Sequence, residues 1–219
     1  MKKRRKKTMI NVVLATILVL AVVLVATLIQ TPAKQVVERV IDPFQNVKKY
    51  RSDMHDELAK YHMEKYTTVL LALMQQESRG SGGDPMQASE SAGLAPNSIN
   101  DPKESIRLGV KHFRRVLSYG EEKKVDFPTI LQAYNMGAGY INYVAEHGGK
   151  HSEKLAKAFS LIQVHKKPKV YDCGGNKNNF RYPYCYGDYT YSAKVEKNIN
   201  VLNETVQVNQ TEKTEKKPF

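Results

Sequence analysis

The sequence predicts a mainly α-helical domain behind a single N-terminal transmembrane helix. Three observations support this: an uncharged apolar run near the N-terminus, apolar residues at helical spacing along the chain, and no alternating strand pattern of useful length. A chain of 219 residues has room for one ordinary domain plus appendages. We divide it into a cytoplasmic basic segment, a transmembrane helix, a juxtamembrane stalk, a helical domain and a disordered tail, at residues 1–8, 9–29, 30–49, 50–205 and 206–219.

The N-terminal segment carries the membrane prediction. Residues 2–7 are all basic, and residues 9–29 contain no charged side chain. At about 1.5 Å per residue, this run spans the roughly 30 Å hydrocarbon core of a bilayer. A cleaved signal peptide is the alternative, but its apolar core is about 7 to 15 residues long and ends in a small-x-small site, which residues 30–34 match poorly. Because basic residues stay in the cytoplasm, we predict a single-pass cell-membrane protein whose domain lies outside.

The charge balance indicates an anionic environment. The formal net charge is +12, and the N-terminal basic cluster accounts for half of it. The remaining excess would favour the carboxylates and phosphates of a bacterial cell wall, and it would also favour nucleic acid. An extracytoplasmic position argues against nucleic acid.

Two cysteines, Cys173 and Cys185, flank a short polar and aromatic loop. An oxidising exterior favours a disulfide, which would contribute about 3 kcal/mol for a loop of this size, and two free thiols are the alternative. Neither a Cys-x-x-Cys pair nor a nearby histidine supplies further zinc ligands. His147 and His151 are four residues apart, but two intervening glycines disfavour the helix that a metal pair needs. We expect both histidines at the surface and no metal.

One helix organises the rest of the chain. Residues 69–74 are too apolar for a surface helix, so we expect this helix to be buried on most sides. Three glycines and Pro85 follow Glu77 closely and end the helix. Apolar packing and the negative end of the helix dipole should both raise the pKa of Glu77, unless Arg79 folds back to offset them. An ordinary exposed glutamate at a frayed helix end is the alternative.

The other helices are predicted from caps and breakers. Asp101, Pro102 and Glu104 supply a cap, a proline at the first helical position and the acid of a capping box, and Gly120 is predicted to end that helix. Two glycines beginning at Gly137 predict a break or a sharp bend. We therefore expect helices that start near residues 50, 101, 126, 140, 152 and 188.

Three short motifs follow one another along the chain: Glu77-Ser78 at a helix end, Met86-Gln87 in the next loop, and Tyr134-Asn135 before the glycine break. Together they resemble the lysozyme-like superfamily, specifically the goose-type lysozyme and soluble lytic transglycosylase group. The likeness is nearest to the membrane-anchored, lysozyme-like cell-wall enzymes of Gram-positive bacteria, and it covers about residues 50–200. The loop beginning at Asp84 reads Asp-Pro-Met-Gln where many relatives read Gly-Leu-Met-Gln, so its main-chain path is not predicted.

The resemblance implies a lysozyme-like helical domain that cleaves peptidoglycan glycan strands between N-acetylmuramic acid and N-acetylglucosamine, without a cofactor. Glu77 would be the catalytic general acid and base. The residues that would line the sugar groove or orient the acid are Ser78, Met86, Gln87, Tyr134, Asn135 and Tyr189. Tyr191 is an alternative aromatic contact, although packing in the core explains it equally well. Asn135 would bind an acetamide group or simply end its helix.

Glycosidic cleavage commonly uses a second carboxylate, and Asp84 and Glu90 are candidates without a strong claim. In lytic transglycosylases one glutamate serves as acid and then base, and the substrate itself completes the reaction to a 1,6-anhydro product. The lack of a clear second carboxylate favours this route over hydrolysis by a muramidase. Two other functions compete with this one. The first is a non-catalytic wall-binding or scaffold protein on the same fold. The second is a basic adhesin that binds polyanions through charge alone, and high salt would abolish that binding.

Overall fold

The computed structural model describes the backbone of residues 42–215 and the side chains of residues 42–204. This part of the chain is mainly helical and contains no strand, which confirms the helical domain of the predicted fold class. Residues from Pro43 onward form one compact unit. The predicted transmembrane helix at residues 9–29 lies outside the described residues, and none of the described helices is long and apolar enough to cross a membrane.

The domain begins with short helices. They are α2 (Gln45–Lys48), α3 (Arg51–Ala59) and the 3-10 turn η1 (Glu64–Tyr66). The helix predicted to start near residue 50 ends at Ala59, because His62 adopts a left-handed conformation with φ 56°.

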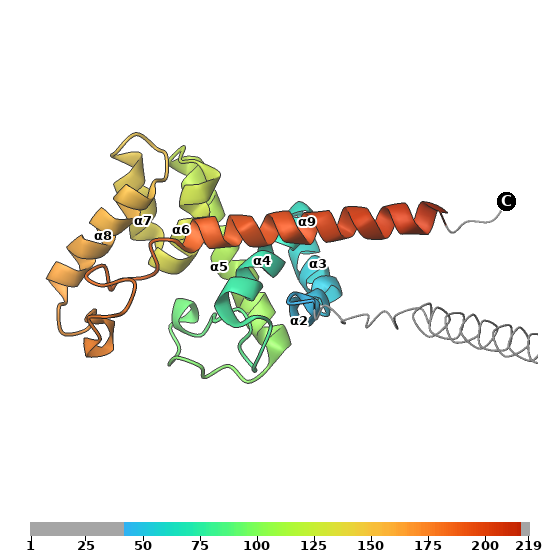
Figure 1. Cartoon of the computed structure of the whole chain (residues 1–219), viewed down its shortest axis with the longest axis horizontal. Coiled ribbons are helices and arrows are strands. Elements are labelled where there is room, and N and C mark those ends of the chain that lie inside the picture. Colours follow the sequence, from blue (N-terminus) through green and yellow to red (C-terminus); the bar gives the residue numbers. More distant parts are fainter. Residues whose placement is uncertain (1–41, 216–219) are drawn as a thin grey trace, which may run out of the picture. The chain divides into compact units, whose positions relative to one another are not determined.

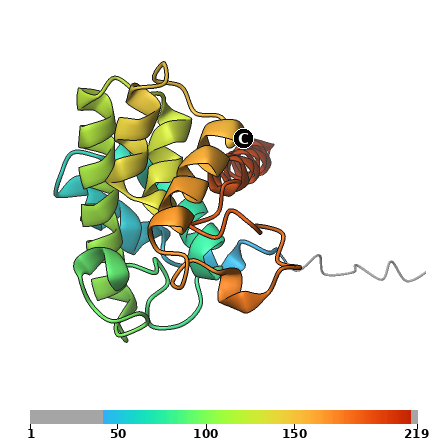
Figure 2. The ribbon, with the colours of Figure 1, turned by 90° about the vertical axis from the view of Figure 1, so that its left-hand side faces the viewer.

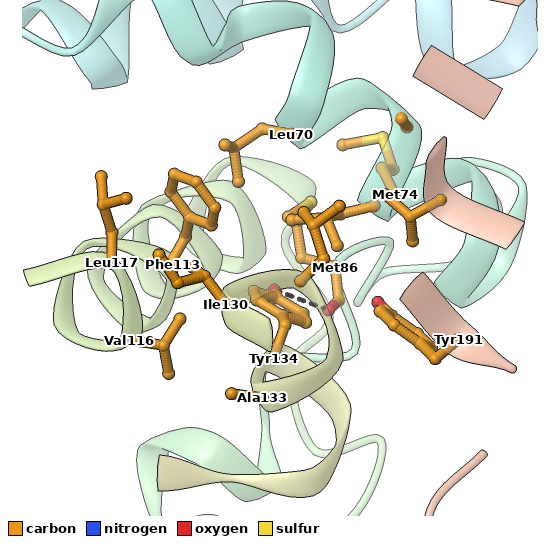
Figure 3. Packing of buried hydrophobic residues seen from close by; sticks show 14 of the residues in the cluster. Leu70, Met74, Met86, Phe113, Val116, Leu117, Ile130, Ala133, Tyr134 and Tyr191 are labelled. Carbon is orange, nitrogen blue, oxygen red and sulfur yellow. Dashed lines mark hydrogen bonds between the residues drawn. The ribbon is translucent and has the colours of Figure 1, made fainter. Parts of the chain in front are cut away.

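Helix α4 (Thr67–Ser78) is the buried centre of the fold, as predicted. All five side chains from Leu70 to Met74 are without exposed surface. They pack mainly against α3 and α9, the long helix that crosses the domain in Figure 1. The buried cluster continues through Met86, Phe113 and Tyr134, as Figure 3 shows.

Helix α5 (Pro102–Glu122) begins as its cap predicts and ends later than predicted. The Asp101 carboxylate accepts a hydrogen bond from the Lys103 N–H at 3.0 Å. Glu104 does not complete a capping box, because it binds Arg107 instead. The prediction that Gly120 ends the helix is wrong: Gly120 is buried inside it, where a Cβ would stand 2.4 Å from Ile130 Cγ1. Close packing of two helices explains this glycine.

The next helices lie beside α5, as the green and yellow ribbons of Figure 2 show. Gly137, with φ 77° and ψ 170°, separates α6 (Phe127–Met136) from α7 (Ala138–Ala145), so the predicted break is present. Helix α8 (Glu153–Lys166) starts where predicted, because the Ser152 hydroxyl accepts from the Leu155 N–H at 3.2 Å.

The last part of the chain closes the domain. Cys173 and Cys185 form a disulfide, and the short turns η2 (Glu90–Ala92) and η3 (Cys173–Gly175) lie in the two long loops. Helix α9 (Tyr191–Glu215) continues into the segment after residue 205 that its composition predicts to be disordered. No proline or glycine interrupts residues 191–217, so nothing in the sequence stops the helix earlier.

Candidate active site

Glu77 lies in the last turn of α4, where the helix is forced to end. Arg79 and Gly80 both adopt left-handed conformations, with φ 55° and φ 70°. A side chain at Gly80 would also stand 3.0 Å from the Asn46 backbone. The chain therefore turns away sharply, and the Glu77 side chain remains partly exposed at the edge of the buried core.

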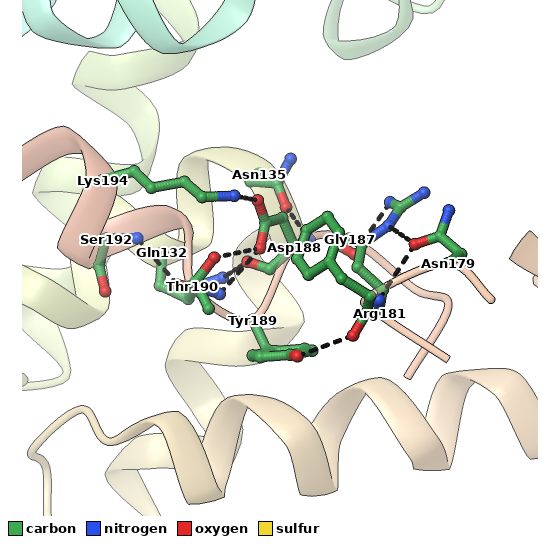
Figure 4. A network of polar contacts seen from close by, with 11 residues as sticks. Gln132, Asn135, Asn179, Arg181, Gly187, Asp188, Tyr189, Thr190, Ser192 and Lys194 are labelled. Atoms are coloured by element: carbon green, nitrogen blue, oxygen red, sulfur yellow. Dashed lines mark hydrogen bonds and ion pairs between the residues drawn. The ribbon is translucent and has the colours of Figure 1, made fainter. Parts of the chain in front are cut away.

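Tyr191, which is distant from Glu77 in the sequence, forms a hydrogen bond with the Glu77 carboxyl. Its hydroxyl donates a hydrogen bond to Glu77 Oε1 at 2.5 Å, across 114 residues of sequence. Tyr191 is itself buried in the first turn of α9. That turn is fixed by Gln132, whose side chain donates to the Asp188 carbonyl at 2.7 Å and accepts from the Ser192 N–H at 3.1 Å (Figure 4). The acid is thus oriented by a rigid helix start.

The environment of Glu77 favours its neutral form. Burial is the main cause and raises the pKa of Glu77 from its ordinary 4.5 to about 7. The negative charge of Asp84 raises the pKa further, whereas the hydrogen bond from Tyr191 lowers it. Arg79 is exposed and contributes nothing to this shift. Glu77 therefore exchanges a proton near neutral pH.

Asp84 is a structural carboxylate. It is buried and accepts four hydrogen bonds, from the Ala88 and Ser89 N–H groups and from the Ser89 and Ser105 hydroxyls, at 2.6 to 3.0 Å. Burial alone would raise the pKa of Asp84, but these donors outweigh it and lower the pKa below its usual value. The bond from Ser105 also ties the loop to α5, which fixes the main-chain path of the Asp-Pro-Met-Gln segment. A carboxylate engaged in this way is not available as a second catalytic group.

A cleft of about 440 Å³ opens beside Glu77. Four of the predicted site residues line it: Glu77, Gln87, Tyr134 and Asn135. The lining residues that the motifs did not predict as sugar contacts are Glu90, Ser91, His112, Arg115, Gly137 and Tyr186. The structure thus brings together the three motifs and leaves Glu90 as the other acid in the cleft.

Ser78 and Met86 lie outside the lining of the cleft. Ser78 donates to the Pro85 carbonyl at 2.7 Å and accepts from the Gly80 and Ser81 N–H groups, so it fastens the loop to α4. The Met86 side chain is fully buried, and its carbonyl accepts from the Tyr134 hydroxyl at 3.3 Å, the dashed line in Figure 3. Neither residue lines the cleft.

Tyr189 and Asn135 differ in their relation to the cleft. The Tyr189 hydroxyl donates to the Phe180 carbonyl at 3.0 Å within the cysteine loop, and Tyr189 is absent from the cleft wall. Asn135 Oδ1 accepts from the Asp188 N–H at 2.7 Å, in close contact with Gly187, where a Cβ would stand 2.8 Å from that oxygen. Asn135 therefore supports the turn that leads to Tyr191 and also faces the cleft.

His112 is a cleft residue that the motifs missed. Its Nε2 lies 3.0 Å from the Tyr134 carbonyl, and Arg115 donates to its Nδ1 at 3.0 Å. These partners fix a neutral ring with the proton on Nε2, and burial lowers the pKa of His112 accordingly. The signal in the sequence was a lone histidine beside the apolar stripe of α5.

The expectation that both histidines after α7 lie at the surface is wrong for His151. His147 is exposed, but His151 is partly buried between the Tyr140 hydroxyl at 2.7 Å and the Ser192 hydroxyl at 2.9 Å. Its backbone N–H donates to the Asp126 carboxylate at 3.0 and 3.1 Å. His151 therefore links α7, α9 and the start of α6. The described residues include no group of three potential metal ligands.

Comparison with known proteins defines the family. A sequence model described as lysozyme-like matches residues 44–199. The chain belongs to the lysozyme-like family. This lysozyme-like chain is 50% identical to the uncharacterized membrane protein YocA of Bacillus subtilis, over 83% of its own length and 78% of that protein. The resemblance predicted from the three motifs is therefore confirmed at the level of the family.

Other relatives are similar over shorter segments. The bifunctional muramidase/DL-endopeptidase CwlT of Bacillus subtilis is 49% identical over 45% of this chain and 29% of its own length. A crystal structure from Staphylococcus aureus, described as similar to a lipoprotein of the NLP/P60 family, is 36% identical with a TM-score of 0.60. The match covers 70% of this chain and about half, 52%, of that structure.

Substitution of Tyr191 by phenylalanine should move the titration of the acid. The hydroxyl of Tyr191 lowers the pKa of Glu77, so its removal should leave that pKa above 7. We expect Tyr191→Phe to retain the fold, because the ring stays buried, and to shift the pKa of Glu77 upward in a carboxyl NMR titration. An unchanged or lower pKa would contradict the assigned hydrogen bond. Tyr189→Phe is the matched control and should not affect Glu77.

Proposed function

We propose that this protein cleaves the glycan strands of peptidoglycan between N-acetylmuramic acid and N-acetylglucosamine, with Glu77 as acid and then base. The observation that carries the proposal is a partly exposed carboxyl with a pKa of about 7 beside a cleft. Membership of the lysozyme-like family supports a glycosidase, and the relative CwlT is a muramidase by name. A protonated carboxylic acid at neutral pH is what a glycosidic leaving oxygen requires.

The mechanism starts with neutral Glu77. Tyr191 occupies Oε1, so the other carboxyl oxygen carries the proton to the glycosidic oxygen. The bond to the leaving sugar then breaks, and positive charge develops on the ring that stays. The Glu77 carboxylate next accepts a proton from the attacking hydroxyl group, which restores the neutral acid. Gln87 and Asn135 present amide groups to the cleft and are our candidates for binding the N-acetyl substituents.

We favour lytic transglycosylation over hydrolysis. Asp84 is engaged by four donors, and Glu90 is the remaining acid in the cleft lining. In our proposal Glu77 is the one acid–base group, and the hydroxyl of the substrate itself is the nucleophile. The product would then be a 1,6-anhydro sugar rather than a reducing end.

Mass spectrometry of released fragments tests both points. The full-length protein in detergent would be incubated with purified peptidoglycan, beside its Glu77→Gln and Glu90→Gln variants. Anhydro-muramyl products that depend on Glu77 and not on Glu90 would support our proposal. Reducing ends that need both residues would mean hydrolysis with Glu90 as the second carboxylate. If wild-type protein bound the strands without releasing any fragment, a wall-binding or scaffold role would replace the enzymatic one.

Activity should fall as the pH rises through neutrality. Because the first step needs protonated Glu77, kcat/KM for strand cleavage should be highest below about pH 7 and drop tenfold per pH unit well above it. Initial rates of fragment release from peptidoglycan, measured from pH 5 to 9, test this decrease in kcat/KM. An activity that is constant from pH 6 to 9 would contradict Glu77 as the general acid.

We also propose that residues 9–29 anchor the protein in the cell membrane and that the domain lies outside. The apolar run, the preceding basic cluster and the relative named as a membrane protein support this topology. Protease added to intact cells should then digest the domain and leave the N-terminal segment. Protection of the domain until the cells are lysed would argue against it.

A further inference from the structure

A second cavity, of about 590 Å³, adjoins the Glu77 cleft. The two cavities share Ser91, His112 and Arg115 in their linings. Eight residues of α5 line the second cavity, most of them three or four positions apart on one side of the helix: Leu108, Lys111, His112, Arg114, Arg115, Ser118, Tyr119 and Glu122. The cleft therefore continues as a groove along α5, which we call the α5 groove.

The charges of the α5 groove are ordered along the helix. Arg115 lies at the junction with the Glu77 cleft, and Lys111 and Arg114 line the second cavity within one helical turn of it. In the described part of the chain none of the three has an ion pair with a carboxylate; Arg114 lies over the Tyr61 ring at 4.3 Å, and Arg115 binds His112. The far end carries an acid, Glu122, whose contact with Lys123 is a loose 3.9 Å.

The spacing of these charges suits a short peptide. Arg115 and Glu122 are seven residues apart, which is about 10 Å along a helix. An extended peptide covers that distance in about three residues. A ligand of the α5 groove should therefore carry a negative group near the Glu77 cleft and a positive group about 10 Å further on.

We propose that the α5 groove binds the peptide stem attached to the muramic acid beside the cleaved bond. This inference rests on the proposed function. The stem of peptidoglycan carries a free carboxylate near its attachment to the sugar and then a diamino acid, so its charges follow the order that the groove complements. A neutral glycan would gain nothing from three cations, and a polyphosphate would be repelled by Glu122. Lys111 and Glu122 are thus specificity residues, not catalytic ones.

The experiment compares two substrates that differ only in the stem. Glycan strands free of teichoic acid would be used either with intact stems or after an amidase has removed the stems. The full-length protein in detergent should show a kcat/KM about tenfold higher for strands with stems. Lys111→Glu should reduce this preference by about three- to tenfold, as expected when an exposed charge contact is reversed. Lys103→Glu, the same change in the first turn of α5 away from the groove, should keep the wild-type preference.

A second variant tests the far end of the groove. Glu122→Lys should slow the cleavage of strands whose diamino acid has a free amine, and should not slow strands in which that amine has been acetylated. Since both variants change exposed side chains, thermal unfolding should remain unchanged.

The outcomes separate this inference from the proposed function. If the wild type cleaves both substrates at equal rates, the function stands and the α5 groove does not bind the stem. Equal loss of activity by Lys111→Glu on both substrates would also overturn the inference, because it would indicate a contact with the glycan. If the wild type cleaves neither substrate, the proposed function fails and this inference fails with it.

Discussion

Glu77→Gln should abolish strand cleavage and at the same time stabilise the domain. A general acid contributes about 10² to 10⁴ in rate, and in a site with one acid–base group we expect a loss near the upper end. The amide keeps an oxygen that accepts from the Tyr191 hydroxyl, so the geometry should survive. The measurement is the release of soluble fragments from peptidoglycan at pH 6, where wild-type Glu77 is mostly protonated.

The stability change has a definite sign with pH. The pKa of Glu77 rises from 4.5 to about 7 on folding, so ionisation destabilises the folded state. This cost is absent below pH 4.5, grows between pH 4.5 and 7, and reaches at most about 3 kcal/mol above pH 7. Glu77→Gln removes the cost, so its free energy of unfolding should exceed that of the wild type at pH 8 and equal it at pH 4. Denaturant unfolding at both pH values measures the difference.

Measuring activity and stability together excludes misfolding as the cause of the lost activity. A variant that loses activity because it misfolds would be less stable, whereas we expect a more stable one. Glu121→Gln, an exposed glutamate outside both cavities, is the matched control and should change neither quantity. Equal stability of Glu77→Gln and the wild type at pH 8 would show that folding does not raise the pKa of Glu77.

Asp84→Asn should be the most destabilising single substitution in the loop beside the acid. It replaces an ionised carboxylate that accepts four hydrogen bonds with an amide that offers a single oxygen and adds two donors. Buried donors would lose their acceptor, which costs about 3 kcal/mol or more. We expect the free energy of unfolding at pH 7 to fall by about this amount.

The penalty should depend on pH in the direction opposite to that of Glu77. The donors lower the pKa of Asp84 below 3.8, so its ionised form stabilises the fold at neutral pH. This contribution is full above pH 3.8 and is lost as the pH falls through the lowered pKa. The difference between Asp84→Asn and the wild type should therefore shrink in strong acid.

A matched control comes from the same helix that Asp84 binds. Asp101→Asn makes an identical chemical change at the exposed cap of α5, where asparagine is as good a cap as aspartate. We expect it to alter the free energy of unfolding by a few tenths of a kcal/mol at most. If Asp84→Asn proved equally harmless, Asp84 would not be the anchor of the loop.

The features of the fold that depend on neighbouring residues could be predicted from the chain alone. The apolar run of α4 gave a buried helix, and the glycines after it placed Glu77 at its end. The caps at Asp101 and Ser152 and the break at Gly137 are also local, because backbone geometry and side-chain hydrogen bonds act over a few residues. The two motifs that follow Glu77 predicted that further chain segments would meet it.

The surroundings of Glu77 depend on residues that are distant in the sequence and could not be predicted from local patterns. Tyr191, at the start of a helix 114 residues away, binds Glu77, whereas Tyr189, two residues earlier, faces the cysteine loop. Asp84 proved to be an anchor because Ser105, on the next helix, reaches it. Such contacts depend on how the helices pack. The residues next to Asp84 or Tyr191 in the sequence do not indicate that packing. Local patterns therefore account for the place of Glu77 at a helix end, and long-range packing accounts for its pKa and its hydrogen-bond partner.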